Sequence, residues 1–261
     1  MKNFSGACLT LIMLAGCSSV DRGDFGSFQR SLNDKSYGYT LVADPLDPNN
    51  LKPVERFEVR SGDCSRDKDW DDCHYDRERS ELSQKTRRAS HGDEIWYAWE
   101  VYFPEDYSNI YPTKTALGQF HQEKAPPIFM FQNQAYHKFT EQITKGGYHL
   151  DYQVGGETDT MWELLKEEDL RGKWHRIEVH AKWSRDYDGI FYVWVNNELK
   201  VKFHGRTLEK NRAYFKYGVY RTFVSRHLRY HKTDTVPTQV VYYRNVAAGD
   251  SRAEIQPEIL Q

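Results

Sequence analysis

Residues 94–103 read EIWYAWEVYF and are followed by Pro104. Aromatic and β-branched side chains occupy both parities of this stretch, as expected for a strand that lies between two packed layers. The whole chain of 261 residues carries the same bias, with 18 Tyr, 13 Phe and 7 Trp but only 4 Met. Flat side chains suit a pleated surface, so the composition favours strands over helices. We therefore predict a single all-β domain.

Further alternating or β-rich segments follow this strand along the chain. The step Asp188-Gly189 predicts a hairpin between two of them, and residues 160–168 are predicted to form a short helix. A two-sheet antiparallel β-sandwich, a jelly roll of concanavalin-like type, accounts for this arrangement. The other expected strands are residues 117–122, 128–132, 148–154, 175–183, 190–195, 214–220 and 239–246.

The N-terminus has the pattern of an export signal. Lys2 precedes an apolar run over residues 7–15 that is too short to span a bilayer, and Leu-Ala-Gly stands directly before Cys17. This resembles the lipobox of bacterial lipoproteins, which implies cleavage before Cys17 and a lipid anchor on it. An ordinary signal peptide with a chance cysteine is the alternative. The expected parts are a signal peptide (1–16), a lipid-anchored tether (17–35) and the folded domain (36–261).

The residues after the lipobox bear on localisation and redox state. Ser18 follows Cys17, as in lipoproteins sorted to the outer membrane. We expect an outer-membrane lipoprotein of the bacterial cell envelope, on its periplasmic or surface side, with the lipid anchor as its only membrane contact.

Cys64 and Cys73 should then form a disulfide, since disulfides persist in exported proteins. The acidic loop between them lacks EF-hand spacing and a second cysteine pair, which disfavours a metal site.

Three stretches carry polar side chains at every second position, and the period of two places each set on one face of a strand. For any one strand, a solvated sheet face is the simpler explanation. If the three strands share a sheet, however, their polar faces form the floor of a groove. Phe120 would then point into the sandwich. The three sets are Arg77, Arg79 and Glu81; Gln119 and His121; and Tyr214, Lys216, Gly218 and Tyr220.

The same stretches resemble the three signature strands of jelly-roll polysaccharide lyases. Residues 79–82 (RSEL), 119–121 (QFH) and 214–220 (YFKYGVY) look like the alginate lyase patterns R-[ST]-E-L, Q-[IV]-H and Y-F-K-x-G-x-Y. The surrounding sequence is nearer to the heparin lyase I and glucuronan lyase-like family, and the resemblance covers roughly residues 54–249. It implies a lyase on a jelly-roll fold.

The resemblance implies β-elimination from a uronic acid chain, in which the C5 proton is removed and the oxygen at C4 is expelled. The intermediate places extra charge on the carboxylate, which Arg79 and Gln119 are expected to bind. His121 is the expected base and Tyr220 the expected acid, or Tyr220 performs both steps where the C5 proton lies on the leaving-group side. The expected substrate-binding residues are Arg77, Lys216, Tyr214, Arg221, Arg226 and Arg229.

The expected partner is an anionic polysaccharide, glucuronan-like or another 1,4-linked uronate polymer, cleaved to unsaturated oligosaccharides. Ser83 and Arg221 depart from the alginate pattern, so alginate is an alternative substrate, and a non-catalytic carbohydrate-binding lipoprotein is an alternative function. The cationic stretch 221–232 is either a solvated loop or a contact to neighbouring uronates. The formal net charge of -2 argues against a nucleic-acid partner.

Other chemistries find less support in the sequence. Concanavalin-type glycoside hydrolases require an E-x-D-x-x-E strand, which the chain lacks. It also lacks the G-x-S-x-G nucleophile elbow of a Ser-His-Asp hydrolase. We expect a monomer that requires no cofactor. No metal site is predicted, and a structural calcium ion remains an alternative for which no set of ligands stands out.

Overall fold

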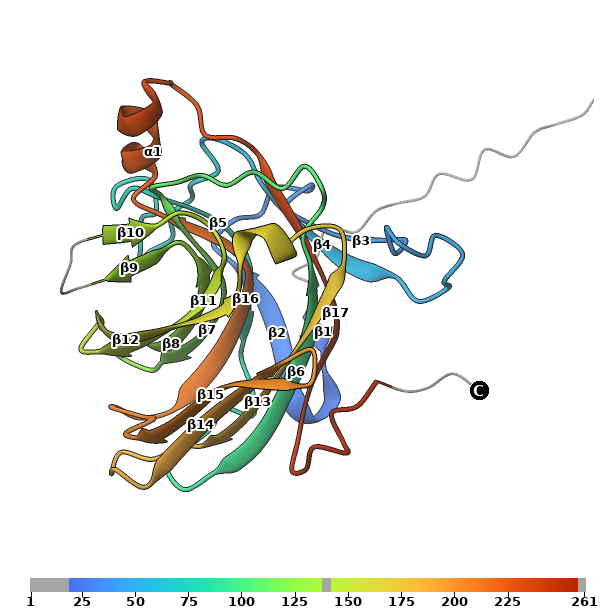
Figure 1. The fold of residues 1–261 in the computed structure, drawn as a ribbon, viewed down its shortest axis with the longest axis vertical. Coiled ribbons are helices and arrows are strands. Elements are labelled where there is room, and N and C mark those ends of the chain that lie inside the picture. Colours follow the sequence, from blue (N-terminus) through green and yellow to red (C-terminus); the bar gives the residue numbers. More distant parts are fainter. Residues whose placement is uncertain (1–18, 138–141, 258–261) are drawn as a thin grey trace, which may run out of the picture.

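The computed structural model describes residues 19–137 and 142–257. They form two antiparallel sheets that pack face to face in a strongly curved sandwich (Figure 1). This confirms the predicted all-β, two-sheet fold. Cys17 and the predicted signal sequence lie outside the described residues. Within the described ranges, no helix is long and apolar enough to cross a membrane.

The first sheet has eight strands in the order β1-β2-β5-β16-β7-β8-β11-β12. Its centre consists of β5, β16 and β7, the three strands whose polar faces the sequence singles out. The eight strands are β1 (Val20–Asp21), β2 (Ser27–Ser31), β5 (Arg77–Gln84), β16 (Ala213–Thr222), β7 (Lys114–Gln122), β8 (Ala125–Asn133), β11 (Tyr148–Val154) and β12 (Glu157–Leu165).

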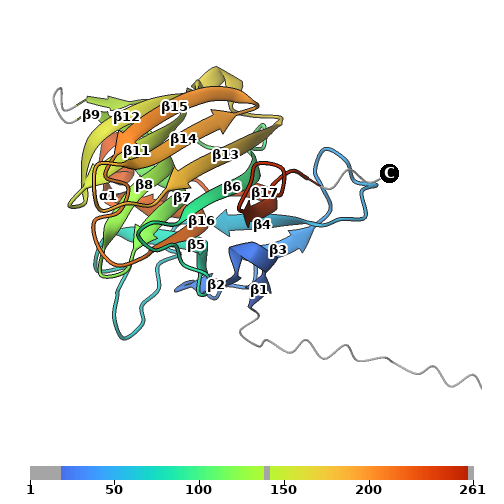
Figure 2. The ribbon, with the colours of Figure 1, turned by 90° about the horizontal axis from the view of Figure 1, so that it is seen from below.

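The second sheet has seven strands in the order β15-β14-β13-β6-β17-β4-β3, which Figure 2 shows from its outer side. The predicted strand EIWYAWEVYF forms β6 except for its last residue, Phe103, and β6 lies in the middle of this sheet. The seven strands are β15 (Glu198–Gly205), β14 (Gly189–Val195), β13 (Trp174–Lys182), β6 (Glu94–Tyr102), β17 (Gln239–Gly249), β4 (Val54–Val59) and β3 (Tyr39–Val42). A separate ribbon and the helical segments are β9 (Ala135–His137), β10 (Gln142–Thr144), η1 (Gly23–Phe25), η2 (Glu167–Asp169) and α1 (Val224–His231).

Aromatic side chains fill the space between the sheets. Trp99 of β6 lies with its ring centroid 4.9 Å from those of Phe131 and Phe215, and Phe120 lies 4.9 Å from Phe215. All four side chains are at most 1% exposed. Edge-to-face and tilted pairs of this kind stabilise beyond the area they bury. The inward position of Phe120 is as predicted, and it fixes which face of β7 looks outward.

One predicted element is wrong, and one helix was not predicted. Residues 160–168 form no α-helix: β12 (Glu157–Leu165) pairs with β11 there, and only the three-residue turn η2 follows. The edge of β11 offers unpaired backbone groups, so sheet pairing overrides the local helical pattern. The stretch 221–232, left open between a solvated loop and a contact to neighbouring uronates, contains the unpredicted helix α1. Val224 of α1 is buried in a small separate apolar cluster.

The N-terminal segment expected to be a tether is partly built into the sandwich. Strand β2 (Ser27–Ser31) pairs with β5 within residues 17–35. Phe25 and Phe28 are 1% and 0% exposed in the main core. Two isolated apolar side chains between polar ones give no periodic signal, so their burial depends on a partner strand distant in sequence. The ordered domain therefore begins before residue 36.

The predicted disulfide is confirmed. Cys64 and Cys73 are bonded, with 5.0 Å between their Cα atoms. The loop that they close lies beside strand β5, where Asp72 becomes fully buried. The bridge thus fixes an otherwise charged and turn-rich loop against the sheet that carries the predicted site.

Candidate active site

The three predicted polar faces come together on one sheet. β16 lies between β5 and β7, and its backbone register places Tyr220 opposite Arg79 and Lys216 opposite Gln119. The core-facing parity of β16, including Phe215 and Tyr217, is fully buried. The period of two therefore separates the site side chains from the core, as predicted.

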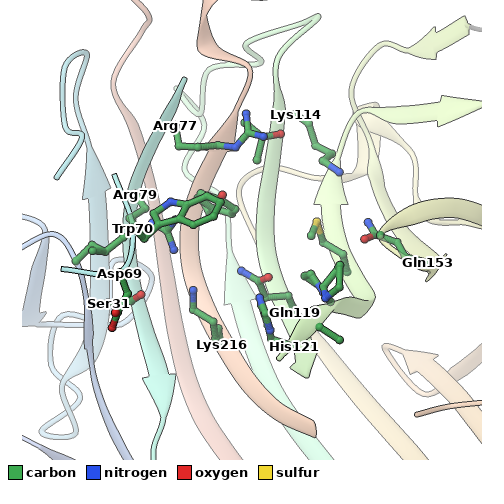
Figure 3. Close-up of a pocket in the computed structure, with 18 of the residues that line it drawn as sticks. Ser31, Asp69, Trp70, Arg77, Arg79, Lys114, Gln119, His121, Gln153 and Lys216 are labelled. Carbon is green, nitrogen blue, oxygen red and sulfur yellow. The ribbon is translucent and has the colours of Figure 1, made fainter. Parts of the chain in front are cut away.

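A cavity of about 910 Å³ opens over these strands. Figure 3 shows Gln119, His121 and Lys216 at one end of it and Arg77 and Lys114 at the other, with Trp70 at its side. Six of the predicted site residues line it: Arg77, Arg79, Gln119, His121, Lys216 and Tyr220.

The carboxylate of Glu81 connects three of these side chains. It accepts hydrogen bonds from the amide of Gln119 (2.6 Å) and the ammonium of Lys216 (2.8 Å). It also accepts one from Arg79 (3.2 Å). Burial alone would raise the pKa of Glu81, but the charges of Lys216 and Arg79 outweigh burial and hold that pKa below its usual value. Glu81 therefore stays ionised and orients donors from all three strands.

Arg79 is held from a second side by the disulfide loop. Its Nε and Nη2 donate to the two carboxylate oxygens of Asp72, at 2.6 and 2.5 Å. The indole of Trp70 donates to the same carboxylate (2.8 Å). A guanidinium carries five N–H donors, and the bonds to Asp72 and Glu81 use three of them. Two donors thus remain for a ligand in the cavity.

His121 is held in one neutral form. Its Nδ1 lies 2.9 Å from the backbone carbonyl of Gln122, and because a carbonyl can only accept, Nδ1 carries the proton. Burial, followed by the nearby charge of Lys216, lowers the pKa of His121 to about 4. The imidazole is therefore uncharged at neutral pH, with Nε2 as its acceptor nitrogen.

Tyr220 lies under the guanidinium of Arg79, whose central carbon is 4.2 Å from the ring centroid. Burial raises the pKa of this phenol, while the charges of Arg79 and Arg77 oppose the rise. The phenol is thus protonated at rest, and the surrounding cations favour its ionised form when a proton leaves.

His121 and Tyr220 lie at separate positions along the groove. In the register of β16 and β7, His121 is opposite Tyr214 and Tyr220 is opposite Ala116, five residues from His121 along β7. The two predicted proton-transfer groups therefore line the same cavity without being neighbours in the sheet.

The other predicted substrate-binding residues divide into different environments. Tyr214 stacks on His121, with 5.1 Å between ring centroids, but does not line the main cavity. Arg226 lines a smaller adjoining cavity, whereas Arg229 is exposed on α1 and lines neither of the two.

Arg221 requires a correction, because it does not reach the cavity. Its side chain is 0% exposed and points between the two sheets. There it pairs with Glu78 (3.1 Å) and donates to the carbonyl of Val59. Its parity along β16 is that of Phe215 and Tyr217, so the alternation itself assigns it to the interior. The proposed contact between Arg221 and substrate is therefore wrong.

Several residues that build or line the site were not among the predicted site residues. Glu81 shares a strand face with Arg79, which is the signal that marks its role as a partner of the other site residues. Asp72 and Trp70 reach the site only through the folding of the disulfide loop, and Lys114 lies at the start of β7, before the segment predicted as a strand. No cluster of three potential metal-ligating His, Cys, Asp or Glu side chains occurs within residues 19–137 and 142–257.

Solved structures with the same fold include enzymes of two reaction types. Endo-β-1,4-glucuronan lyase from the fungus Trichoderma reesei matches with a TM-score of 0.61 and 17% identity, over 87% of this chain and 92% of that one. The alginate lyase AlgAT5, of polysaccharide lyase family 7, matches with a TM-score of 0.53 and 16% identity, over 82% of this chain and 83% of that one. A GH131 β-glucanase catalytic domain from Podospora anserina matches with a TM-score of 0.51 and 14% identity, over 86% of this chain and 79% of that one.

These identities establish the fold alone, which both lyases and a glucanase use. No curated protein sequence matches the chain significantly. The family model for polysaccharide lyases, in contrast, matches residues 23–247, nearly the whole described structure. That match includes all three strands of the cavity floor. The chain therefore belongs to the polysaccharide lyase family.

Proposed function

We propose that this polysaccharide lyase acts on a 1,4-linked uronate polymer of the glucuronan type and releases unsaturated oligosaccharides. One observation carries the proposal: the phenol of Tyr220 and donors from Arg79, Gln119 and Lys216 line a single cavity. These groups match what elimination beside a carboxylate needs, namely a proton-transfer group and stabilisation of developing negative charge. The shared fold with a glucuronan lyase makes glucuronan the first polymer to test.

The carboxylate of the reacting uronate would lie against the donors that Glu81 and Asp72 orient. Arg79 retains two N–H groups, and Lys216 and Gln119 each retain at least one beyond their bonds to Glu81. Because their positions are fixed before substrate binds, little reorganisation accompanies the charge that develops in the transition state. These donors would therefore stabilise the enolate-like intermediate more than the bound substrate.

Tyr220 would transfer the proton from C5 to the oxygen at C4. In a 1,4-linked glucuronate these two positions lie on the same face of the ring, so one group can serve both. His121 is separated from Tyr220 along the groove, which favours a single proton-transfer group. In this scheme the phenol ionises with help from Arg79, removes the C5 proton, and returns it to the leaving oxygen. His121 would bind a sugar hydroxyl through Nε2.

A panel of uronate polymers tests the substrate. Glucuronan, alginate and a glycosaminoglycan would each be incubated with the mature domain while ultraviolet absorbance reports the unsaturated product. We expect the highest kcat/KM on glucuronan. Product from alginate alone would assign the enzyme to alginate, and absence of product from every polymer would overturn the uronate proposal.

We further propose that the enzyme is an outer-membrane lipoprotein anchored through Cys17. The lipobox sequence before Cys17 supports this. The disulfide between Cys64 and Cys73 is typical of an exported domain. Cys17→Ser should leave a precursor without lipid that no longer fractionates with membranes. Unchanged membrane association of this variant would contradict the anchor.

A further inference from the structure

The main cavity continues into a second one. The smaller cavity has a volume of about 370 Å³ and shares Lys114, Gly156 and Phe223 with the larger one. Figure 3 shows Arg77 and Lys114 at one end of the main cavity. The smaller cavity adjoins this end through Lys114 and is also lined by Arg226 of α1. A polymer bound over Tyr220 can therefore continue past the cleaved bond in this direction.

Phe223 stands where the two cavities meet, in an unusual conformation. Its φ is +61°, in the left-handed region that a bulky residue rarely adopts, and its side chain is 40% exposed. Two hydrogen bonds hold the backbone there: its N–H donates to the carbonyl of Asp76 (2.9 Å), and its carbonyl accepts from the hydroxyl of Thr113 (2.9 Å). An exposed aromatic side chain kept in a strained conformation points to a role at the surface.

Two guanidiniums rest on the ring of Phe223. The central carbon of Arg77 lies 4.0 Å from the ring centroid, and that of Arg226 lies 4.2 Å from it. Cation–π contacts of this kind fix the arginines without using up their N–H donors. Arg77 comes from β5 and Arg226 from α1, so the ring holds together cations that are distant in sequence.

Positive charge at this junction is only partly compensated by carboxylates. Within the described ranges, neither Arg77 nor Arg226 forms an ion pair with a carboxylate. Lys114 is 4.0 Å from Asp151, and Glu157 also lines the second cavity. Burial lowers the pKa of Lys114, and repulsion from Arg77 and Arg226 lowers it further, while Asp151 acts in the opposite direction. Three cations that repel one another around a cavity favour an anionic ligand.

We propose that Arg77, Arg226 and Lys114, arranged around Phe223, form a second carboxylate subsite for a uronate of the same chain, away from the bond that is cleaved. This inference rests on the proposed uronate substrate and deepens it. Guanidiniums bind carboxylates through paired N–H donors, and the ring keeps both in place before binding. The subsite makes the enzyme prefer long substrates, because short oligomers cannot fill it and the main cavity together.

Arg226→Ala tests the subsite, with Arg185→Ala as the control. Arg185 is an exposed cation in the turn between β13 and β14 and lines neither cavity, so both variants lose one positive charge. KM and kcat would be measured on the cleaved polymer and on its size-fractionated oligomers. For Arg226→Ala we expect KM to rise roughly 10-fold on long substrates, with kcat within about two-fold and no change on the shortest cleaved oligomers. Arg185→Ala should match the wild type.

Arg226→Lys and added salt provide independent readouts. The lysine variant keeps the charge and should recover part of the KM of the wild type, which a purely structural role for Arg226 would not predict. Salt should reduce the difference between Arg226→Ala and wild type, since screening weakens the contact. The subsite is refuted if Arg226→Ala and Arg185→Ala behave alike, or if KM rises equally at all lengths. If the wild type cleaves no uronate polymer, the proposed function fails instead.

Discussion

Strands β5 and β16 carry two cross-strand pairs that are one residue apart and differ in their surroundings. Tyr220 lies opposite Arg79 on the cavity face, and Arg221 lies opposite Glu78 on the interior face. Both arginines are almost fully buried, with 6% and 0% exposure, and both are paired with carboxylates. Burial and ion pairing therefore do not identify a functional arginine. What distinguishes the two arginines is whether the side chain lines a cavity in which its remaining N–H donors can bind a ligand. Arg79 lines the cavity and Arg221 does not.

The strongest test of the cavity-facing pair is Tyr220→Phe. Removal of the phenol oxygen abolishes proton transfer but keeps the ring under Arg79, so kcat should fall by about 10²–10⁴-fold while polymer binding persists. Unfolding in denaturant should change little. The kcat of Tyr214→Phe, a variant on the same face of β16, should fall by less than about 10-fold. Near-normal turnover of Tyr220→Phe would eliminate Tyr220 as the proton-transfer group.

The interior pair should respond in the opposite way. Arg221→Met leaves Glu78 buried without its cation, which should lower the free energy of unfolding by about 3–5 kcal/mol. The kcat of the folded fraction should stay near that of the wild type, because Arg221 does not reach the cavity. Denaturant titration and assays at low temperature measure the two effects.

A matched double variant sharpens this test. Arg221→Met combined with Glu78→Gln removes the uncompensated charge and should recover part of the lost stability. A large fall in kcat with unchanged stability in Arg221→Met would place Arg221 in the site after all.

The disulfide loop supports only the cavity-facing pair, through Asp72. Cys73→Ser should lower the free energy of unfolding by about 2–3 kcal/mol, as expected for a short closed loop. It should also lower kcat several-fold, since Asp72 would hold Arg79 less firmly. The variant Cys64→Ser should give the same values. Loss of stability with unchanged kcat would show that Arg79 needs no support from the loop.

The smallest expected effect separates the two candidate bases. If Tyr220 removes the proton, kcat/KM should keep rising between pH 7 and 9, because burial raises the pKa of this phenol above its usual value and the reactive form is the deprotonated one. His121→Ala should then lower kcat/KM by less than about 10-fold.

If His121 were the base, the result would differ in kind. Its pKa of about 4 means that it is already deprotonated above pH 5, so kcat/KM would rise through pH 4 and then stay level. His121→Ala would then remove the rise of kcat/KM near pH 4, together with most of the activity.

Part of the site could be predicted from the sequence because it depends on strand alternation. Gln119 and His121, like Tyr220 and Lys216, lie on single strands, and a period of two assigns their face without knowledge of the partner strand. The same rule places Arg221 with the core residues of β16, on the opposite face from the predicted substrate-binding residues Tyr214 and Lys216.

Contacts between distant segments could not be predicted in this way. Asp72 reaches Arg79 because a disulfide loop folds onto β5, and Phe223 meets Arg77 because α1 docks beyond the end of β16. The helix predicted over residues 160–168 failed for a related reason, because β11 offered that segment a pairing edge that local sequence does not reveal.

The sequence by itself determined the all-β sandwich, the disulfide pair and the polar faces of three strands, since each follows from local alternation, composition or cysteine count. Tertiary structure alone decided that the three strands are adjacent, that Glu81 and Asp72 hold Arg79, and that Arg77, Lys114 and Arg226 surround one junction. Side-chain packing and ion pairing act over a few ångströms in space, between residues whose separation along the chain exceeds any local pattern.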